Sequence, residues 1–533
     1  MKNELKNLTS KVAKGLMTRR EFVARAAALG VTAAVANSML AKTALADAKP
    51  VVGGTFRMGV QGGESTNTQD PASWASDVPI AIGQLWGETL VEVEADGSLS
   101  GLVAESWEGT ADAKTWSFKI RQGCTFSTGA QVTADDVLKT MERHSSDKTE
   151  SGAAGIMKGI KSMSADGDTF TVELEIGNAD LPYLMADYHL MIQPGGGFDD
   201  PAAAIGTGAY VMETFDPGVR ASATRRSDYW GGDQTMTAHY DKVEVIVLND
   251  ATARTAALQS GQVDVINRVE PKIAKLLDRA PTLSVKNVSG RGHYVFIMHI
   301  DTAPFDNNHL RLALKYAINR QEMVDKILQG FGGIGNDMPI NAAYPLFDDT
   351  IPQREFDLEK AAAHYKESGH DGSPIILRTA DGAFPGAVDA AALFQESARQ
   401  AGIPLEIKRE PNDGYWSEVW NVQPFSASYW GGRPVQDQMY ATAYLSTADW
   451  NDTRWKREDW DAKLLAARAE LDEAKRKAIY SEMGRELRDE GGLILPMFND
   501  FIDAVSNEVQ GFEGDPNGPQ MNWYAFKKTW KTG

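Results

Sequence analysis

Segments with strand character alternate with segments with helix character along most of this chain, and this order constrains its fold more than any other feature. Trp116, Phe118 and Ile120 alternate with polar neighbours, which predicts a strand with one buried face. Thr133 then offers a hydroxyl cap ahead of acidic residues, a pattern typical of a helix start. Residues 242–250 read as an apolar strand. Such alternation, with strand pairs in between, predicts an α/β fold with mixed sheets.

Further along, apolar residues recur at helical spacing in two long segments, 306–327 and 460–490, and each segment predicts a helix. The segment 493–498 then reads as a strand. Residues 166–168 (DGD) stand before an alternating segment and predict a hairpin turn rather than a calcium loop. The glycines of 332–335 are not followed by a helix, so we expect an irregular loop there.

The first 46 residues differ from the rest of the chain, because they carry five lysines and three arginines against two glutamates. Arg19 and Arg20 precede the uncharged run 26–36 and the small-x-small triplet 44–46. These three parts predict an export signal of the twin-arginine type, cleaved near Ala46. The apolar run is shorter than the about 20 residues that cross a bilayer. A retained membrane helix or a basic amphipathic arm is the alternative.

The chain beyond this signal is acidic and holds a single cysteine, Cys124. One cysteine cannot form an internal disulfide, so the core alone has to stabilise the fold in an oxidising compartment. The net charge of −19 argues against nucleic acid or anionic lipid as a partner. No other apolar run approaches the length of a membrane span, and no cysteine follows the signal to carry a lipid. We therefore expect a soluble periplasmic protein of two or three domains.

Few patterns typical of catalysis occur in the sequence. It has no G-x-S-x-G elbow, no H-E-x-x-H, no G-K-[ST] loop and no C-x-x-C. His293 and His299 flank a strand-like segment at an even spacing, which places them on one face. No cysteine or carboxylate cluster nearby completes a metal site, so we expect a surface or cleft-lining role for both. These observations predict a protein that is not an enzyme and that needs no cofactor or metal.

Four blocks of the sequence follow one another in a characteristic order. They are residues 102–137 (beginning LVAESW), 206–232 (from GTGAYV to YWGG), 253–265 (ARTAALQSGQVDV) and 304–324 (PFDNNHLRLALKYAINRQEMV). In this order they resemble the family 5 solute-binding proteins of ABC importers, the receptors for dipeptides, oligopeptides, nickel and related solutes. The resemblance extends from about Gly53 to the C-terminal residues.

This resemblance implies a two-lobed periplasmic binding protein fold of type II, cluster C, with an extra subdomain in lobe I and a hinged ligand cleft. Lobe I is then expected at 47–280, completed by 505–533, and lobe II at 281–504. The implied function is a monomeric receptor that captures a peptide or peptide-like solute between closing lobes and delivers it to the permease subunits of an ABC importer, with their ATPases. Closure follows because a ligand that contacts both lobes binds the closed state better.

Other functions stay open at this point. They are a periplasmic enzyme exported by the twin-arginine route, a nickel-type receptor for a metal chelate, and a sensor or chaperone role. The metal-chelate alternative rests only on His293 and His299.

The ligand-reading segment of the family matches residues 427–434, and here the chain departs from the peptide receptors. In those receptors an aspartate in this segment binds the α-ammonium group of the peptide. That acid is missing here, and Arg433 stands beside Gly432. A guanidinium that faces the cleft would bind a carboxylate through two parallel hydrogen bonds, which favours an opine-like or acidic ligand. In the alternative, Arg433 faces solvent or pairs with Asp437.

Further candidate contacts surround this position. Trp430 is expected to stack on the ligand, and the two glycines after it would let backbone groups approach the ligand. Asp77 is a candidate partner for an ammonium group, and Tyr294 is a candidate lining residue on the hinge side. The predicted ligand-binding residues are Arg433, Trp430, Tyr429, Gly431, Gly432, Asp77 and Tyr294.

Overall fold

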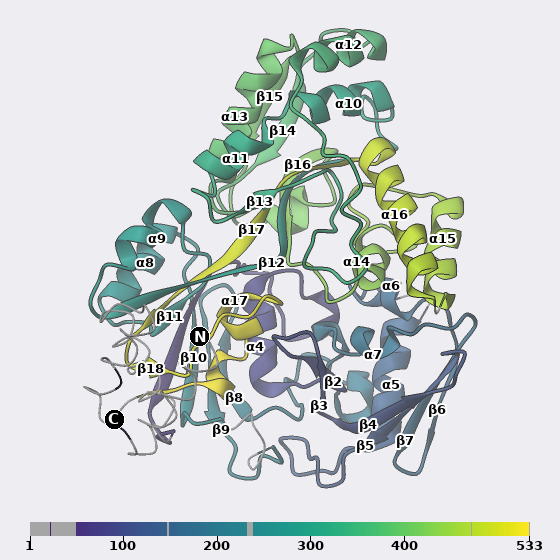
Figure 1. Ribbon diagram of the computed structural model, residues 1–533. Coiled ribbons are helices and arrows are strands. Elements are labelled where there is room, and N and C mark those ends of the chain that lie inside the picture. Colours follow the sequence, from purple (N-terminus) through teal and green to yellow (C-terminus); the bar gives the residue numbers. More distant parts are fainter. Residues whose placement is uncertain are drawn as a thin grey trace.

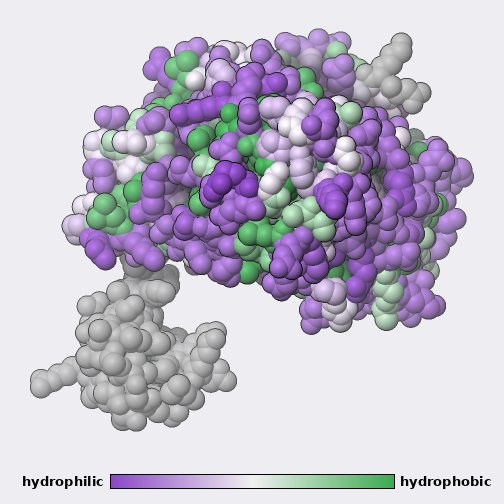
Figure 2. Space-filling view, turned by 90° about the horizontal axis from the view of Figure 1, so that it is seen from above, coloured by the Kyte–Doolittle hydropathy of each residue, from purple (hydrophilic) through white to green (hydrophobic). Residues whose placement is uncertain are grey.

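The structure is a computed structural model that describes residues 50–146, 149–231, 238–470 and 472–531, together with Met17 and Phe22. The predicted export signal, residues 1–46, lies outside the described residues apart from those two positions. Among the described residues, no helix is both long and apolar enough to cross a membrane. On the face shown in Figure 2 the described residues are mainly hydrophilic, with hydrophobic residues in small groups between them.

A mixed sheet of eleven strands runs through the molecule (Figure 1). Its strands follow in space in the order β15 (Leu405–Arg409), β14 (Ile375–Thr379), β16 (Phe425–Trp430), β12 (Leu283–Met298), β17 (Leu493–Ser506), β11 (Val265–Ile266), β1 (Thr55–Val60), β10 (Lys242–Val247), β9 (Arg220–Arg225) and β8 (Tyr210–Asp216), with β13 (Gly332–Ile334) beside β17. β1 is parallel to β10 and β11, whereas β11 and β17 are antiparallel. The predicted α/β fold with a mixed sheet is confirmed.

Two long strands, β12 and β17, join the two lobes of the fold. The first part of β12 pairs with the C-terminal part of β17, and the residues from His293 onward pair with β16 and with the N-terminal part of β17. The register of the two strands shifts between Ser289 and His293. Each lobe has its own buried core, with Phe56 in the first and Leu377 in the second.

An additional four-stranded antiparallel sheet lies between β1 and β8 in the sequence, at the lower right of Figure 1. Its order is β4 (Ala104–Gly109), β5 (Thr115–Ile120), β7 (Thr169–Leu174) and β6 (Ile160–Asp166), and α5 (Ala134–Ser145) shares its core. Thr133 caps α5: its hydroxyl accepts from the N–H of Asp136, whose carboxylate accepts from the N–H of Thr133. The predicted subdomain, hairpin and helix start are confirmed.

Helices cover both lobes. Lobe II carries α10 (Asn308–Ala317), α11 (Arg320–Lys326), α12 (Leu358–Ser368), α13 (Ala387–Gln400), α14 (Gln436–Ala443), α15 (Glu458–Ala469) and α16 (Glu473–Glu490). The first lobe carries α4 (Asp77–Trp86), α8 (Ala251–Gln259) and α9 (Pro271–Leu277), with short helices α6 (Ala154–Met157), α7 (Leu181–Leu184), α17 (Pro519–Asn522) and α18 (Ala525–Lys528). Two small strand pairs complete it, β2 (Val91–Val93) with β3 (Leu99–Gly101) and β18 (Val509–Gln510) with β19 (Trp530–Lys531).

Two predicted long helices are each broken in two, so these predictions were wrong. In the segment 306–327, the first helix ends at Ala317 and Asn319 caps the next, because its side chain accepts from the N–H of Glu322 at 3.1 Å. In the segment 460–490, the Asp472 side chain accepts from two N–H groups at the start of α16, each at 3.0 Å. Each cap starts a new helix, although the apolar spacing continues across the break.

The glycines of 332–335 do not form the predicted irregular loop, because Gly332–Ile334 is the strand β13. It pairs antiparallel with β17. A Cβ atom on Gly332 would lie 2.3 Å from the Phe498 carbonyl oxygen, and its φ is +156°. Glycine is needed here because it lets the chain lie against β17.

His293 and His299 are both buried, so the predicted surface or cleft-lining role was wrong for both. His293 Nδ1 lies 3.0 Å from the Arg291 carbonyl oxygen, and its ring packs against Phe498 with 5.5 Å between the ring centres. Burial lowers the pKa of each histidine to about 4, so both imidazoles are neutral at pH 7. They pack within the fold instead of facing a ligand.

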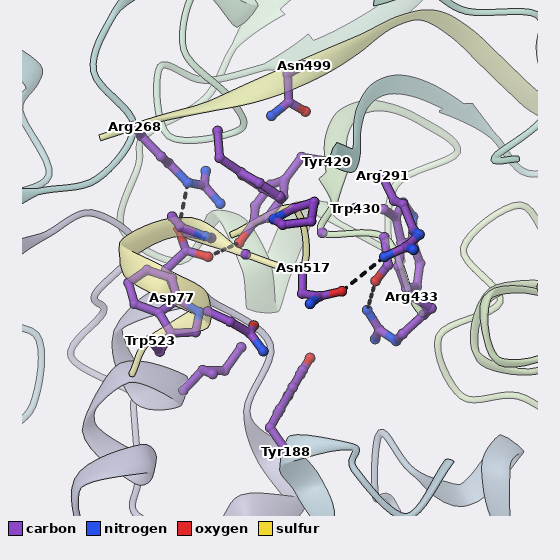
Figure 3. A pocket seen from close by; sticks show the side chains of 18 of the residues that line it. Asp77, Tyr188, Arg268, Arg291, Tyr429, Trp430, Arg433, Asn499, Asn517 and Trp523 are labelled. Atoms are coloured by element: carbon purple, nitrogen blue, oxygen red, sulfur yellow. Dashed lines mark hydrogen bonds and ion pairs between the residues drawn. The ribbon is translucent and has the colours of Figure 1, made fainter. Parts of the chain in front are cut away.

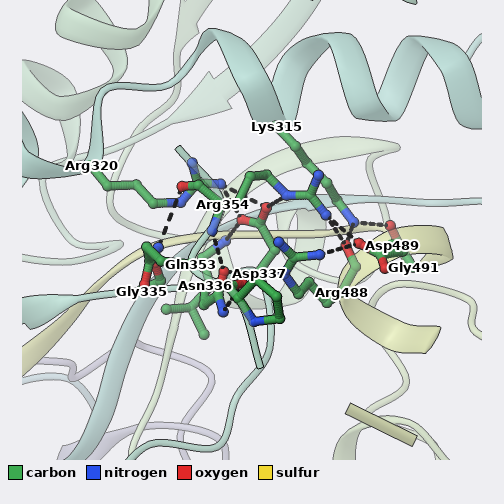
Figure 4. Close-up of polar contacts among 12 residues, drawn as sticks. Lys315, Arg320, Gly335, Asn336, Asp337, Gln353, Arg354, Arg488, Asp489 and Gly491 are labelled. Carbon is green, nitrogen blue, oxygen red and sulfur yellow. Dashed lines mark hydrogen bonds and ion pairs between the residues drawn. The ribbon is translucent and has the colours of Figure 1, made fainter. Parts of the chain in front are cut away.

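A buried ionic network in lobe II is centred on Asp337 (Figure 4). Arg320 Nη2 donates to both oxygens of Asp337, at 2.7 and 2.6 Å, and Arg354 Nε donates to Oδ2 at 2.8 Å. The N–H of Leu495 in β17 donates to Oδ1 at 3.0 Å. Lys315 Nζ donates to two carbonyl oxygens at the C-terminal end of α16. The network therefore fixes the chain after β13 against β17.

Candidate ligand-binding site

A cavity lies between the two lobes and encloses about 1640 Å³, solvent at its mouth included. The start of α4 lines it from lobe I, and the end of β16 lines it from lobe II (Figure 3). All seven residues predicted from the sequence lie in this lining: Asp77, Tyr294, Tyr429, Trp430, Gly431, Gly432 and Arg433. The structure brings them together in one place, and their contact with a ligand stays a prediction.

Arg433 lies three residues after the end of β16, and its side chain is only 9% exposed. Its Nη1 donates to the Gly432 carbonyl at 2.7 Å, while its buried Nε and Nη2 make no hydrogen bond with a described residue. Both alternatives for this residue were wrong: it does not face solvent, and Asp437 pairs instead with Arg468 at 2.5 Å. Arg433 therefore lines the cavity with donor groups to spare.

The acid nearest to Arg433 is Asp187, whose Oδ2 lies 3.8 Å from Arg433 Nε. Asp187 is already engaged: Oδ1 contacts His189 Nδ1 at 2.5 Å and Oδ2 accepts from Gln438 Nε2 at 3.1 Å. Burial alone would raise the pKa of Asp187, but His189 and Arg433 outweigh that effect and hold the pKa at about 2. Asp187 is thus ionised at neutral pH, and it leaves Arg433 Nη2 without a hydrogen-bond partner among the described residues.

Asp77 begins α4 and does line the cavity, but it has a cation of its own. Its Oδ2 accepts from Arg268 Nε at 2.6 Å and from Asn267 Nδ2 at 3.0 Å, and its Oδ1 accepts from the Tyr429 hydroxyl at 3.3 Å. The Arg268 guanidinium also lies 3.8 Å from the centre of the Tyr429 ring. Asp77 therefore already has a cationic partner in the cavity wall, and its predicted contact with the ammonium group of a ligand stays a prediction.

A second guanidinium, that of Arg291, lines the cavity beside Arg433. Its Nη1 donates to Asn517 Oδ1 at 3.0 Å and its Nε to the Ala343 carbonyl at 3.2 Å. It forms no ion pair with a described residue, and burial lowers its pKa. Gly432 has a φ of +83°, and a Cβ there would lie 2.4 Å from the Cβ of Arg291. The glycine therefore lets the two arginines approach each other.

We expect Gly432→Ala to lower the stability of the protein by about 1–3 kcal/mol, because alanine is strained at this φ and would collide with Arg291. Gly431→Ala is the matched control, since a Cβ on Gly431 meets no atom within 4 Å and its φ is not positive. Urea unfolding followed by tryptophan fluorescence measures both variants. Equal stability of the two would contradict this account of the turn.

Aromatic rings form much of the remaining wall. Trp430 packs edge to face against Trp450 and Trp420, with ring centres 5.9 and 6.3 Å apart. Trp430 and Trp420 both donate their indole N–H to Asp452 Oδ2, at 3.1 and 3.0 Å, so the rings are held in place. The Tyr294 ring stacks on Phe384 at 4.4 Å. These rings give a ligand a rigid apolar surface beside the guanidinium groups.

Several lining residues were missed from the sequence, chiefly Arg268, Arg291, Asp187 and Tyr188. They come from segments far apart in the chain, and only the fold brings them to the cavity. For Arg291 one signal was available, because it stands between two glycines at the start of a strand-like segment. No histidine lines the cavity among the described residues, so the metal-chelate alternative loses its support from the sequence.

The arrangement is suited to binding a partly apolar molecule that carries a carboxylate. Three arginines among the described residues line the cavity, and of these only Arg268 has a close carboxylate partner within the described part of the chain, at 2.6 Å. Arg291 forms no ion pair with those residues, and Arg433 has one long contact at 3.8 Å. A carboxylate between Arg291 and Arg433 would accept charge-assisted hydrogen bonds in a setting with little water, where such bonds are strongest.

Comparison with known proteins identifies the family of this chain. The model of the bacterial extracellular solute-binding proteins, family 5, matches residues 98–452, which is more than half of the chain. The di/tripeptide-binding protein 1 of Pseudomonas aeruginosa is 24% identical over 493 residues, which cover 84% of this chain and 90% of that protein. The glutathione-binding protein GsiB of Salmonella typhi is 25% identical over 506 residues, which cover 91% and 95%.

Solved structures share the fold over almost their whole length. The binding protein AgaA of A. tumefaciens R10, in complex with agropinic acid, aligns with a TM-score of 0.81 and 22% identity, over 90% of this chain and 99% of its own. DppA of Helicobacter pylori, in complex with the peptide STSA, aligns with a TM-score of 0.81 and 20% identity, over 91% and 99%. The two-lobed fold is thereby confirmed, and with the family match it leads to one conclusion: the chain belongs to the family 5 bacterial extracellular solute-binding proteins.

Proposed function

We propose that this protein is the receptor of an ABC importer and that it binds a small solute with at least one carboxylate, either opine-like or an acidic peptide. The observation that carries this proposal is Arg433, a buried cavity-lining arginine with two N–H positions that no described residue satisfies. An unsatisfied buried guanidinium is costly, and a carboxylate on the ligand would remove that cost. Arg291 beside it supplies further donors.

The compared proteins include one named for ordinary peptides and one that holds an acid. One related protein is named for di- and tripeptides, and one solved neighbour holds agropinic acid. In this chain the segment 427–434 carries Arg433 and no acid. The pairing of Asp77 with Arg268 further lowers the affinity expected for a ligand ammonium group. An acid-bearing solute therefore fits the cavity better than an unmodified neutral dipeptide.

Binding would stabilise closure of the lobes, for which we propose the boundaries 47–280 with 505–533 and 281–504. Contacts already cross between these lobes: Arg476 pairs with Asp180, and Gln438 Nε2 donates to Asp187 at 3.1 Å. The C-terminal segment rejoins lobe I, where Lys527 pairs with Glu88 at 2.6 Å. A ligand held from both sides adds to these contacts only in the closed state.

We further propose how the protein reaches the periplasm and delivers its solute. The protein would be exported by the cleaved signal that ends near Ala46 and would act in the periplasm as a monomer. The closed, loaded form would then be recognised by the permease subunits of the importer, with their ATPases. Binding without chemical change of the solute is the activity that we propose.

Thermal unfolding with matched ligand pairs tests this proposal. Each acidic peptide or opine is compared with the same molecule in which the carboxylate is converted to an amide. We expect the acid to raise the melting temperature and the amide to do so far less, because the amide has no charge to place between Arg291 and Arg433. Equal shifts from acid and amide would contradict the carboxylate preference, and no shift with any acid, peptide or metal chelate would contradict the receptor function itself.

A further inference from the structure

Two histidines and a glutamate come together on lobe II, apart from the cavity. They are His309 in α10 and His364 and Glu367 in α12, two helices at the top of Figure 1. Among the described residues this is the one group of three histidine, cysteine or acidic side chains whose ligand atoms all lie within 4.8 Å of one another. None of the three lines the cavity between the lobes.

The distances within this cluster suit a metal ion. His309 Nδ1 lies 3.0 Å from His364 Nδ1 and 3.0 Å from Glu367 Oε2, and His364 Nδ1 lies 3.7 Å from the same oxygen. A zinc ion about 2.0–2.1 Å from two nitrogens, at angles of about 90–110°, separates them by about 2.9–3.4 Å. Two of the three separations already lie in this range. The third needs a small movement of Glu367, whose side chain is 59% exposed and free to adjust.

Hydrogen bonds alone satisfy the cluster poorly. Only one of the two imidazoles can carry a proton on Nδ1 across a contact of 3.0 Å, because two N–H groups would otherwise face each other. That one proton would have to be shared in hydrogen bonds to both the second nitrogen and the carboxylate oxygen. A divalent cation would accept all three lone pairs at once.

The surrounding structure holds the cluster in place. Asn307, the cap of α10, donates through Nδ2 to the Ser368 carbonyl at the end of α12, at 3.0 Å. The His364 ring stacks nearly parallel on Tyr316 of α10, with 5.7 Å between the ring centres and 7° between the planes. His364 and Glu367 are three residues apart and so lie on one face of α12. The two helices are thus fixed relative to each other before any ion binds.

We propose that His309, His364 and Glu367 form a surface binding site for a divalent transition-metal ion of the zinc type, which would bridge α10 and α12. Two imidazoles and one carboxylate are a donor set that zinc accepts, and three protein ligands leave a coordination position open to water. Oxygen-preferring ions such as magnesium fit this set less well. The site is separate from the ligand cavity, so the metal bound here would stabilise lobe II without being the transported solute.

Zinc titration of the whole mature protein tests this inference. The protein is prepared without a polyhistidine tag, stripped with EDTA, dialysed and titrated with ZnCl₂ in a calorimeter. We expect one equivalent of zinc per chain and a higher melting temperature with zinc than without. Loss of an outer hydrogen-bond partner of a metal ligand already costs about 10–100-fold in affinity, so His309→Ala and His364→Ala should each lose at least that much.

Control variants separate this site from other sources of zinc binding. His370→Ala removes another histidine of the same lobe and should keep the affinity, as should Arg433→Gln in the cavity. Glu367→Gln is a second probe that removes only a charge from an exposed side chain. This variant should fold normally but bind zinc more weakly than the wild type does. The inference is overturned if the wild-type protein takes up no zinc, or if the His309, His364 and Glu367 variants all bind it as tightly as the wild type.

Discussion

Replacing Arg433 with glutamine is expected to weaken the binding of a carboxylate-bearing ligand by about 30-fold or more, equivalent to about 2 kcal/mol or more. Glutamine keeps much of the length of the side chain and one amide donor but removes the charge. The arginine is 9% exposed, and two of its nitrogens have no hydrogen-bond partner among the described residues. Apart from its long contact with Asp187, the ligand carboxylate would therefore supply the negative charge that balances it in the cavity. Isothermal titration calorimetry with the acid from the thermal screen measures the change directly.

The matched control for this prediction is Arg399→Gln on α13. Arg399 is 70% exposed and pairs with Glu396 one turn earlier, so its loss should leave ligand affinity unchanged. Arg291→Gln should weaken binding as well, because Arg291 lines the same part of the cavity. If Arg433→Gln bound the acid as tightly as the wild type, the carboxylate would have to be held elsewhere in the cavity.

Replacing Asp337 with alanine is expected to cost about 3–5 kcal/mol of stability, which is the range for removing one partner of a buried ion pair. The variant would leave Arg320 and Arg354 buried without their shared carboxylate, and it would free the N–H of Leu495 (Figure 4). Urea unfolding followed by tryptophan fluorescence measures the loss. We expect the melting temperature to fall with it.

Asp381→Ala is the control for this prediction, because Asp381 is 56% exposed and pairs with an exposed Arg409. Its cost should stay below about 1 kcal/mol. Burial opposes ionisation of Asp337, but Arg320 and Arg354 outweigh burial and lower its pKa. The contribution of Asp337 is therefore complete above the unfolded pKa of about 3.9 and is lost as the pH falls through the lower folded value. We therefore expect the difference in unfolding free energy between the wild type and Asp337→Ala to be the same at pH 8 and at pH 6. A difference that changed between these pH values would contradict this assignment.

Local patterns predicted the type of most elements but not every boundary. The hydroxyl of Thr133 caps a helix, as the sequence indicated, because a cap depends on neighbours only. The segment 306–327 was predicted as one helix because its apolar spacing continues through the break. Asn319, followed three residues later by Glu322, is a capping signal within that segment. The prediction relied on the apolar spacing, which continues through this signal.

The candidate site was predictable only in part, for a related reason. The segment 427–434 could be identified because the resemblance to the family places it at the ligand. The partners that determine its electrostatics could not, since Asp77 meets Arg268 from 191 residues away and Arg433 meets Asp187 across the two lobes. The same holds for His309, which lies 55 residues from His364 and joins it only through the packing of α10 on α12.

Native mass spectrometry of the mature protein, purified from a periplasmic extract without refolding, tests the central claim most directly. The claim is that the cavity between the lobes binds a small carboxylate-bearing solute at Arg433. We predict that the protein retains a small molecule, that this molecule carries a carboxylate, and that Arg433→Gln purified in the same way is empty. A retained molecule that has no acidic group, or one that stays bound to Arg433→Gln in equal amount, would contradict the claim.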